Sequence, residues 1–163
     1  MNYSRTEVNA LLDEHERAVR YLLSILKRWK EGDLNKSIPH DPKVTYGQVL
    51  NHVIGSGYHG YFVWIQQVLG WEVESPPVDK EEVEELCDLR KQMELLEKMT
   101  PYARHALKNL TNHDLYPTMY MSNWGGYYTI DGMLEHAIVH VWRHIRQLER
   151  AEATLIQQKE QGE

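Results

Sequence analysis

The sequence predicts an all-α protein, a four-helix bundle with a long irregular crossover before its last helix. Apolar residues recur at helical spacing in four long segments, whereas the stretch 112–128 has no period. Long helices with one long crossover connection are the usual elements of such a bundle. No repeat, low-complexity tract or second-domain linker interrupts the 163 residues, so we expect a single helical bundle domain over 1–163.

The first helix is expected from about residue 4 to residue 30. Ser4 and Glu7 have the spacing of a capping box, in which two side chains bond the free backbone N–H groups of a helix start. Apolar residues follow at helical spacing, and basic residues gather where they suit the negative end of the helix dipole. The next stretch, 33–43, contains two prolines and is predicted to be a loop.

A second capping box, Thr45 with Gln48, predicts a helix from there to about Leu69, and Gly70 ends it. Three glycines lie inside this helix, and each costs about 1 kcal/mol of helix propensity: Gly55, Gly57 and Gly60. We expect another backbone or a ligand to come close there, because a residue without a side chain leaves room for it.

The third helix is expected to be capped by Asp79 and to continue through Met99, with glutamates in its first turns. Pro101 leaves two alternatives, a kink in one long helix or the first position of a new helix, and we favour the kink. The aperiodic crossover has room for a short hairpin. Thr129 or Asp131 then caps the last helix, which is expected to reach about residue 157.

Composition and charge exclude several classes of protein. The net charge is −6 and no basic stripe with interleaved aromatic residues is present, so we expect no nucleic acid as a partner. Cys87 is the only cysteine, which excludes an intrachain disulfide and a thiolate zinc site and suits a reducing compartment. The first residues lack the apolar core of a signal peptide, and no run of about 18 apolar residues is present to span a bilayer. We therefore expect a cytoplasmic protein with no membrane partner.

The last helix carries three histidines, His136, His140 and His144, at positions i, i+4 and i+8. Each four-residue step turns by about 40° around the helix axis, so neighbouring histidines share a face and can hold one metal ion. The outer two are about 12 Å apart along the axis, which is too far for one ion. One neighbouring pair and a ligand from elsewhere would therefore form a site.

The second helix offers two further histidines, His52 and His59, which are about 10 Å apart along the axis, so only one of them can join a given site. If the second and last helices are antiparallel, His52 lies nearer His140 and His144, and His59 lies nearer His136. Three imidazoles and a water form a known open metal site. The alternative is that these are ordinary core histidines, spaced by chance in a histidine-rich chain.

The other histidines have no partner at ligand spacing, and we expect them at the surface or as helix caps: His15, His40, His105 and His113. Glu135 and Asp131 are candidates to accept hydrogen bonds from metal-bound imidazoles, although charge at a helix N-terminus explains both more simply. Arg143 and Arg146 either meet an anionic substrate or lie solvated on the outer face of the last helix. Cys87 lies among acidic residues, which disfavour a thiolate nucleophile.

Three parts of the chain resemble the DinB-like (DinB/YfiT) family of four-helix bundle proteins. They are the start of the second helix from Thr45 to His52, the crossover, and the last helix from Thr129 to His144. Members of this family present one histidine on the second helix and a His-x-x-x-His pair late in the last helix, often continued as His-Arg-Gly-Gln. By position, the resemblance implies His52, His140 and His144 as the metal ligands. The chain departs from the pattern after His144, where it has Ile-Arg-Gln, so properties that depend on the family's Arg-Gly pair do not carry over.

The resemblance also implies a function. Characterised relatives in the family include thiol-dependent S-transferases and isomerases, so we expect a metal-dependent enzyme with one divalent ion, zinc, nickel or iron. Its small-molecule substrate would include a low-molecular-weight thiol whose thiolate occupies the open metal position. A hydrolase in which the ion activates water is an open alternative, and so is a non-enzymatic stress-related metal-binding or interaction protein. We also expect a homodimer.

Overall fold

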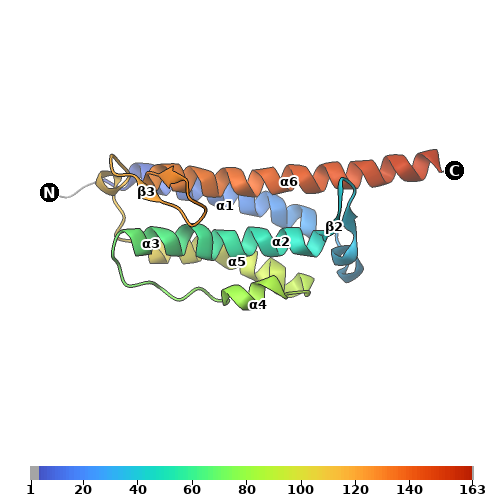
Figure 1. Ribbon diagram of the computed structural model, residues 1–163, viewed down its shortest axis with the longest axis horizontal. Coiled ribbons are helices and arrows are strands. Elements are labelled where there is room, and N and C mark those ends of the chain that lie inside the picture. Colours follow the sequence, from blue (N-terminus) through green and yellow to red (C-terminus); the bar gives the residue numbers. More distant parts are fainter. Residues whose placement is uncertain (1–3, 163) are drawn as a thin grey trace.

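The computed structural model describes residues 4–162 and is mostly helical, as the predicted all-α class requires (Figure 1). Its α-helices, in chain order, are α1 (Thr6–Leu26), α2 (Tyr46–Gly55), α3 (Trp64–Val68), α4 (Lys80–Glu84), α5 (Leu89–Ala106) and α6 (Ile130–Gln161). Shorter or wider helical segments are η1 (Glu31–Asn35), the π-helix η2 (Ser56–Val63) and η3 (Asn112–Asp114). Two antiparallel hairpins pair β1 (Ser37–Ile38) with β2 (Asp41–Thr45), and β3 (Tyr120–Met121) with β4 (Tyr127–Tyr128).

The long helices lie side by side along the long axis of the molecule (Figure 1). α1 packs against α5 and α6, and α2 packs against α4, α5 and α6. α2, η2 and α3 follow one another without a break, and this segment runs in the opposite direction to α6. The β1–β2 hairpin lies at one end of the helices and the β3–β4 hairpin near the other. The antiparallel arrangement therefore places the first turns of α2 beside the middle of α6.

The apolar core lies between these helices, and each long helix contributes fully buried side chains to it: Leu22, Leu50, Phe62, Leu96 and Ile145. Burying one side chain of this size stabilises the fold by about 1.5–3 kcal/mol.

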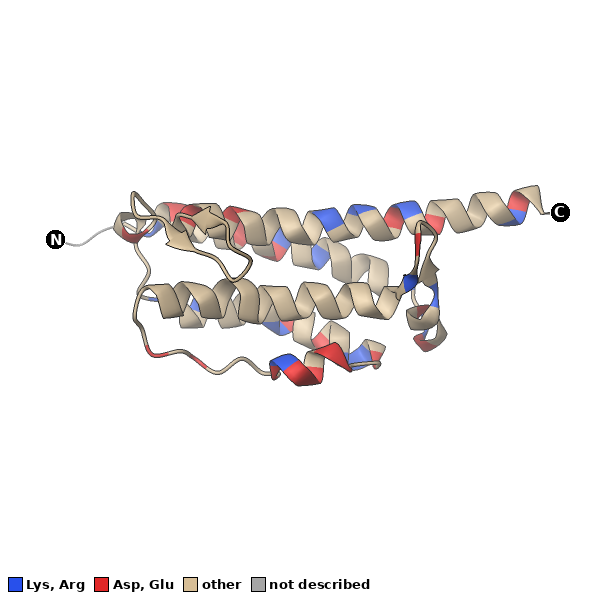
Figure 2. Cartoon of the chain, viewed as in Figure 1, with Lys and Arg blue, Asp and Glu red and all other residues tan. Residues whose placement is uncertain are grey.

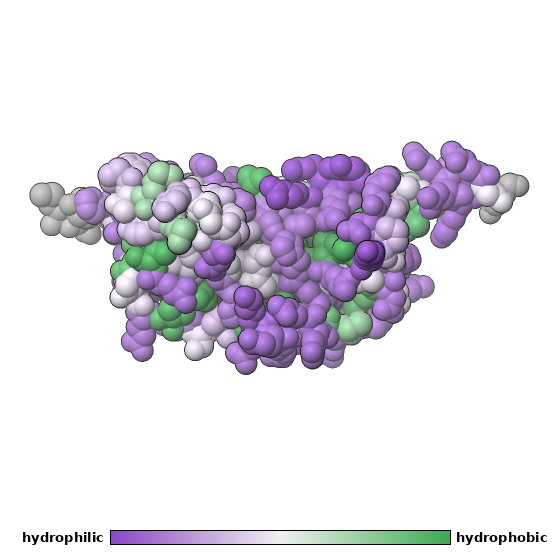
Figure 3. All heavy atoms as spheres, in the orientation of Figure 1, coloured by the Kyte–Doolittle hydropathy of each residue, from purple (hydrophilic) through white to green (hydrophobic). Residues whose placement is uncertain are grey.

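The outer surface differs from this core. On the face drawn in Figure 3, hydrophilic side chains cover α4 and much of α6. In residues 4–162, no helix has the length and the apolar character needed to cross a membrane.

The two predicted capping boxes have different outcomes. At α2 the prediction is confirmed, because Thr45 Oγ1 accepts from Gln48 N at 3.2 Å and Gln48 Oε1 accepts from Thr45 N at 2.9 Å. At α1 the prediction is wrong. The N-cap residue is Arg5, and the backbone N–H of Glu7 donates instead to Asn112 Oδ1 at 3.2 Å. A residue from the crossover, distant in sequence, therefore caps α1.

The predicted second helix is continuous, but its middle is the π-helix η2 rather than an α-helix. The expected close approach is present at Gly57, where an added Cβ would lie 2.5 Å from Met99 Sδ. The neighbour is thus a side chain of α5, neither a backbone nor a ligand. Gly70, with a φ of +71°, follows the helical segment as predicted.

The predicted single third helix is wrong, because the chain breaks after α4 and starts again at α5. Side chains hold both sides of the break: Asp88 Oδ1 accepts from Lys91 N at 2.9 Å, and Asn51 Nδ2 donates to Leu86 O at 2.8 Å. Asp79 precedes α4 but makes no side-chain capping bond. Pro101 lies inside α5, so the alternative of a new helix that starts there is wrong.

The predictions for the loops and for the last helix have different outcomes. The prediction that the stretch 33–43 is a loop is wrong, because this stretch contains the end of η1 and most of the β1–β2 hairpin. The hairpin allowed for in the crossover is present as β3–β4. Thr129 Oγ1, and not Asp131, caps α6 by accepting from Gly132 N at 3.2 Å. α6 reaches Gln161, a turn beyond the predicted end.

Candidate metal centre

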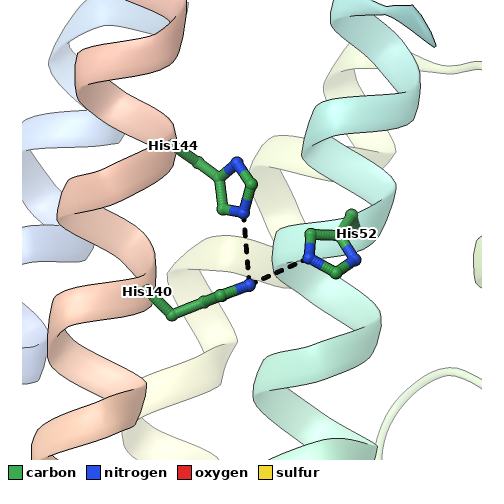
Figure 4. Close-up of side chains that lie close together, drawn as sticks. All are labelled: His52, His140 and His144. Atoms are coloured by element: carbon green, nitrogen blue, oxygen red, sulfur yellow. Dashed lines mark hydrogen bonds between the residues drawn. The ribbon is translucent and has the colours of Figure 1, made fainter.

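Three histidines converge between α2 and α6. His52 from α2 and His140 and His144 from α6 point toward one another (Figure 4). His140 Nε2 lies 2.9 Å from His52 Nε2 and 3.2 Å from His144 Nε2. One ring nitrogen from each histidine lies within 4.8 Å of the others. We call these three side chains the histidine cluster.

The local structure explains this convergence. His140 and His144 are one helical turn apart on α6, so their side chains share a face. His52 follows the Thr45–Gln48 capping box by one turn, and that capping box fixes where α2 begins. Because α2 and α6 are antiparallel, the start of α2 faces this part of α6.

The surroundings of the cluster favour neutral imidazoles. Burial, and next the neighbouring His144 and His52, lower the pKa of His140 to about 3. The pKa of His52 and that of His144 are also lowered, mainly by burial. Neutral imidazoles have one nitrogen with a free lone pair, which is the form that binds metals.

Gln147 determines which nitrogen of His144 carries the proton. Gln147 Oε1 lies 2.7 Å from His144 Nδ1. An oxygen acceptor requires the proton on Nδ1, so His144 Nε2 presents its lone pair to the cluster. Such a partner on the second nitrogen is the usual way in which proteins orient metal-binding histidines.

The donor set fits one divalent ion. With metal–nitrogen bonds of about 2.0–2.1 Å, two ligands of a tetrahedral ion lie roughly 3.3 Å apart. The two short nitrogen–nitrogen distances in the cluster, 2.9 and 3.2 Å, are close to that separation. His140 Nδ1 is buried and has no hydrogen-bond partner in residues 4–162, so ring packing against Tyr61, with centroids 5.4 Å apart, orients His140. The three histidines can therefore hold a metal ion.

A cavity of about 970 Å³ opens beside the cluster. An aromatic wall closes one side of it, where Trp124 stacks on His136 with centroids 5.3 Å apart and Tyr61 meets the same ring edge-on at 5.3 Å. Cationic and amide side chains line other parts of the cavity. This volume is in the range of small-molecule sites, so the cavity can admit a substrate to the cluster.

The remaining sequence candidates have mixed outcomes. His136 and His59 line the cavity but stay outside the cluster, and His59 Nε2 donates instead to Val78 O at 2.9 Å. The prediction that His15 lies at the surface or caps a helix is wrong, because this side chain is 2% exposed and its Nδ1 lies 2.9 Å from Thr100 Oγ1. Among the described hydrogen bonds, none joins Glu135 or Asp131 to the cluster.

Sequence reasoning missed several residues of the cavity. Lys43 comes from β2, and Lys80 and Glu84 come from α4. No sequence signal could have found them, because only the folding of β2 and α4 against α2 brings these surface residues together. Arg143 also lines the cavity, as considered for an anionic substrate, whereas Arg146 does not.

The family described as the DinB superfamily matches the chain over residues 11–148, a range that includes the whole histidine cluster. A search of curated proteins gave no match.

Proposed function

The chain belongs to the DinB superfamily, and from this premise we propose that it is a metal-dependent enzyme whose active site is the histidine cluster. The observation that carries the proposal is the convergence of three neutral imidazoles beside a cavity of about 970 Å³. Histidines that only fill the core would not be expected to direct three ring nitrogens at one point. The arrangement of α1, the α2–α3 segment, α5 and α6 is in keeping with the four-helix bundle that we infer for this family.

The proposed ligands are His52, His140 and His144, and the ion is zinc, nickel or iron, all of which accept imidazole. When bound, such an ion acts as a Lewis acid that lowers the pKa of a thiol or a water. Gln147 holds His144 in the ligating tautomer. Tyr61, Trp124 and His136 cover one side of the cavity and limit access of water there.

We favour thiol transfer, with hydrolysis as the alternative. A cavity near the upper end of the usual 300–1,000 Å³ range has room for a low-molecular-weight thiol beside its acceptor. In such a conjugation the thiol sulfur bonds to an electrophilic carbon of the acceptor. The leaving group departs with the bonding electrons, and the thiol proton passes to solvent.

Metal content tests the proposal first. Protein purified without a histidine tag should contain about one equivalent of zinc, nickel or iron by elemental analysis. His52→Ala and His140→Ala should lose that metal. His59→Ala is the matched control, because His59 lines the same cavity outside the cluster. Wild-type protein that binds no metal, together with unchanged folding of the cluster variants, would remove the enzyme hypothesis and favour a non-enzymatic interaction protein.

Activity is tested next. Metal-loaded protein should accelerate conjugation of cysteine to 1-chloro-2,4-dinitrobenzene, measured as release of chloride. The comparison is with free metal at the same concentration and with His140→Ala. A rate no higher than that of free metal would exclude this thiol transfer, and hydrolysis of an activated ester by the same samples would then test the alternative.

A further inference from the structure

We propose that the cavity beside the histidine cluster binds a small organic anion, and that Arg143, Lys80 and Lys43 hold its carboxylate or phosphate group. The inference rests on the proposed function, because it takes this cavity as the substrate site. It goes further by assigning the chemical class of the substrate.

The first support is the charge of the cavity lining. Three cationic side chains line it from three different elements: Arg143 on α6, Lys80 on α4 and Lys43 on β2. In Figure 2 blue segments are present on α6 above α2, on β2 at the end of α2 and on α4 below α2, where red segments adjoin the blue one. Glu84 is the one carboxylate among the described lining residues. The chain as a whole has a net charge of −6, so this concentration of positive charge is local to the cavity.

The second support is that these cations are not neutralised. In residues 4–162, Arg143, Lys80 and Lys43 make no ion pair, and Glu84 does not pair with Lys80 although it follows one helical turn later. Most lysines and arginines in residues 4–162 also lack an acidic partner, so it is their shared place in the cavity lining that sets these three apart. Unpaired positive charge at a concave surface attracts and concentrates anions.

The third support is the position of Arg143. This residue directly precedes His144 on α6, and it lines the same cavity as His52 and His136. The planar fork of its guanidinium can bind a carboxylate or a phosphate through two hydrogen bonds, whereas the two lysines add point charges.

The aromatic wall completes the ligand description. Trp124 is 48% exposed, so its ring remains available to a ligand even while it stacks on His136. A molecule with an apolar or aromatic part for this wall and an anionic group for the cations would use both features. The ligand is thus an organic anion rather than a free inorganic ion.

Three small probes test the proposal on the full-length chain: phenylacetate, phenyl phosphate and the neutral phenylacetamide. Binding is followed by the NMR signal of the Trp124 indole N–H, identified by its loss in Trp124→Phe. The protein is first dialysed against EDTA, so that no ion can hold the anion, and is then measured again after metal loading. We expect at least one anion to bind about tenfold more tightly than phenylacetamide without metal, as for a charge-assisted hydrogen bond. The stronger of the two anions identifies a carboxylate or a phosphate as the preferred group.

The variants assign the binding to the cations. Arg143→Gln should weaken the preferred anion about fivefold or more, and adding Lys80→Gln and Lys43→Gln should remove the preference over phenylacetamide. Arg143→Lys should keep part of the preference for the anion over phenylacetamide. Arg146→Gln is the matched control, because it removes the same charge from the same helix outside the cavity, and it should change binding less than about twofold.

The outcomes separate this inference from the proposed function. Anion preference in protein that takes up no metal even when metal is supplied supports the inference and overturns the proposed function. Anion binding that needs the metal and is unchanged in Arg143→Gln overturns the inference and leaves the proposed function intact. Equal binding of phenylacetamide and both anions, or equal effects of Arg143→Gln and Arg146→Gln, also overturns the inference.

Discussion

Gln147 Oε1 accepts a hydrogen bond of 2.7 Å from His144 Nδ1, and this bond directs the lone pair of His144 Nε2 toward His140 and His52. Gln147 follows His144 by three residues on α6, so both side chains lie on one face of the helix. The ligating tautomer of His144 is therefore held by its own helix.

Gln147→Ala should weaken metal binding. Without the acceptor, His144 populates the wrong tautomer and its ring turns more freely, and loss of such a partner typically costs 10–100-fold in metal affinity. Competition with a chromophoric chelator measures the effect. Gln157→Ala, an exposed position on the same helix, serves as the control and should leave affinity unchanged. Equal affinities of Gln147→Ala and wild type would contradict the role of Gln147.

His15 should make the fold sensitive to acid. Burial, and next the positive charge of Arg104, lower the pKa of His15 from 6.5 to about 4. Between these two values the unfolded chain binds a proton that the folded chain does not. Stability is therefore fully present above pH 6.5 and falls as the pH decreases toward 4. This group alone should cost roughly 2 kcal/mol of unfolding free energy between pH 7 and 4.5.

His15→Leu removes the titrating group and keeps a buried side chain of similar size. Urea unfolding at pH 7 and pH 4.5 measures the free energies of wild type and variant. The variant should lose about 2 kcal/mol less than wild type over that interval. A variant that loses as much as wild type would show that His15 does not titrate in this way.

Gly57→Ala should destabilise the protein by about 1–3 kcal/mol, the usual cost of overpacking a core. The new Cβ would lie 2.5 Å from Met99 Sδ and 2.8 Å from Met99 Cε, and Met99 is fully buried, so its side chain has little room to move. Gly60→Ala is the matched control in the same π-helix, because the nearest side-chain atom to its Cβ would be 3.8 Å away. Thermal or urea unfolding distinguishes the two. Similar stability of both variants would contradict the close contact.

The histidine cluster could be predicted because it depends on two simple regularities. The helical period places His140 and His144 on one face, and antiparallel packing brings His52 to them. His15 could also have been predicted to be buried, since it lies between Leu12 and Val19 on the apolar face of α1. His15 was expected at the surface because no other histidine lies at ligand spacing from it. Its position on the helix face, and not the absence of such a partner, decides that it is buried.

Other features depend on contacts between distant segments, which no local pattern reports. Asn112 caps α1 from a position 105 residues away from Glu7. Lys43 and Lys80 line one cavity with Arg143 only because β2 and α4 fold against α2 beside α6. The π-helix η2 likewise leaves no distinct period in so short a segment.

The break between α4 and α5 yields a direct comparison of two aspartates, each at an N-cap position. Asp88 accepts a hydrogen bond of 2.9 Å from Lys91 N, whereas Asp79 makes no side-chain capping bond. Asp88→Ala should therefore cost about 1 kcal/mol, within the 0.5–2 kcal/mol known for lost caps. Asp79→Ala should stay within about 0.5 kcal/mol of wild type, as for an exposed residue without a bond.

Both substitutions remove one negative charge from an exposed site, so a shared electrostatic effect cancels in the comparison. Urea unfolding of the two variants and wild type at one pH measures the difference. If Asp79→Ala proved the more damaging variant, Asp79 rather than Asp88 would start the ordered helix. In that case the continuous third helix expected from the sequence would describe the protein in solution better than a break after Glu84.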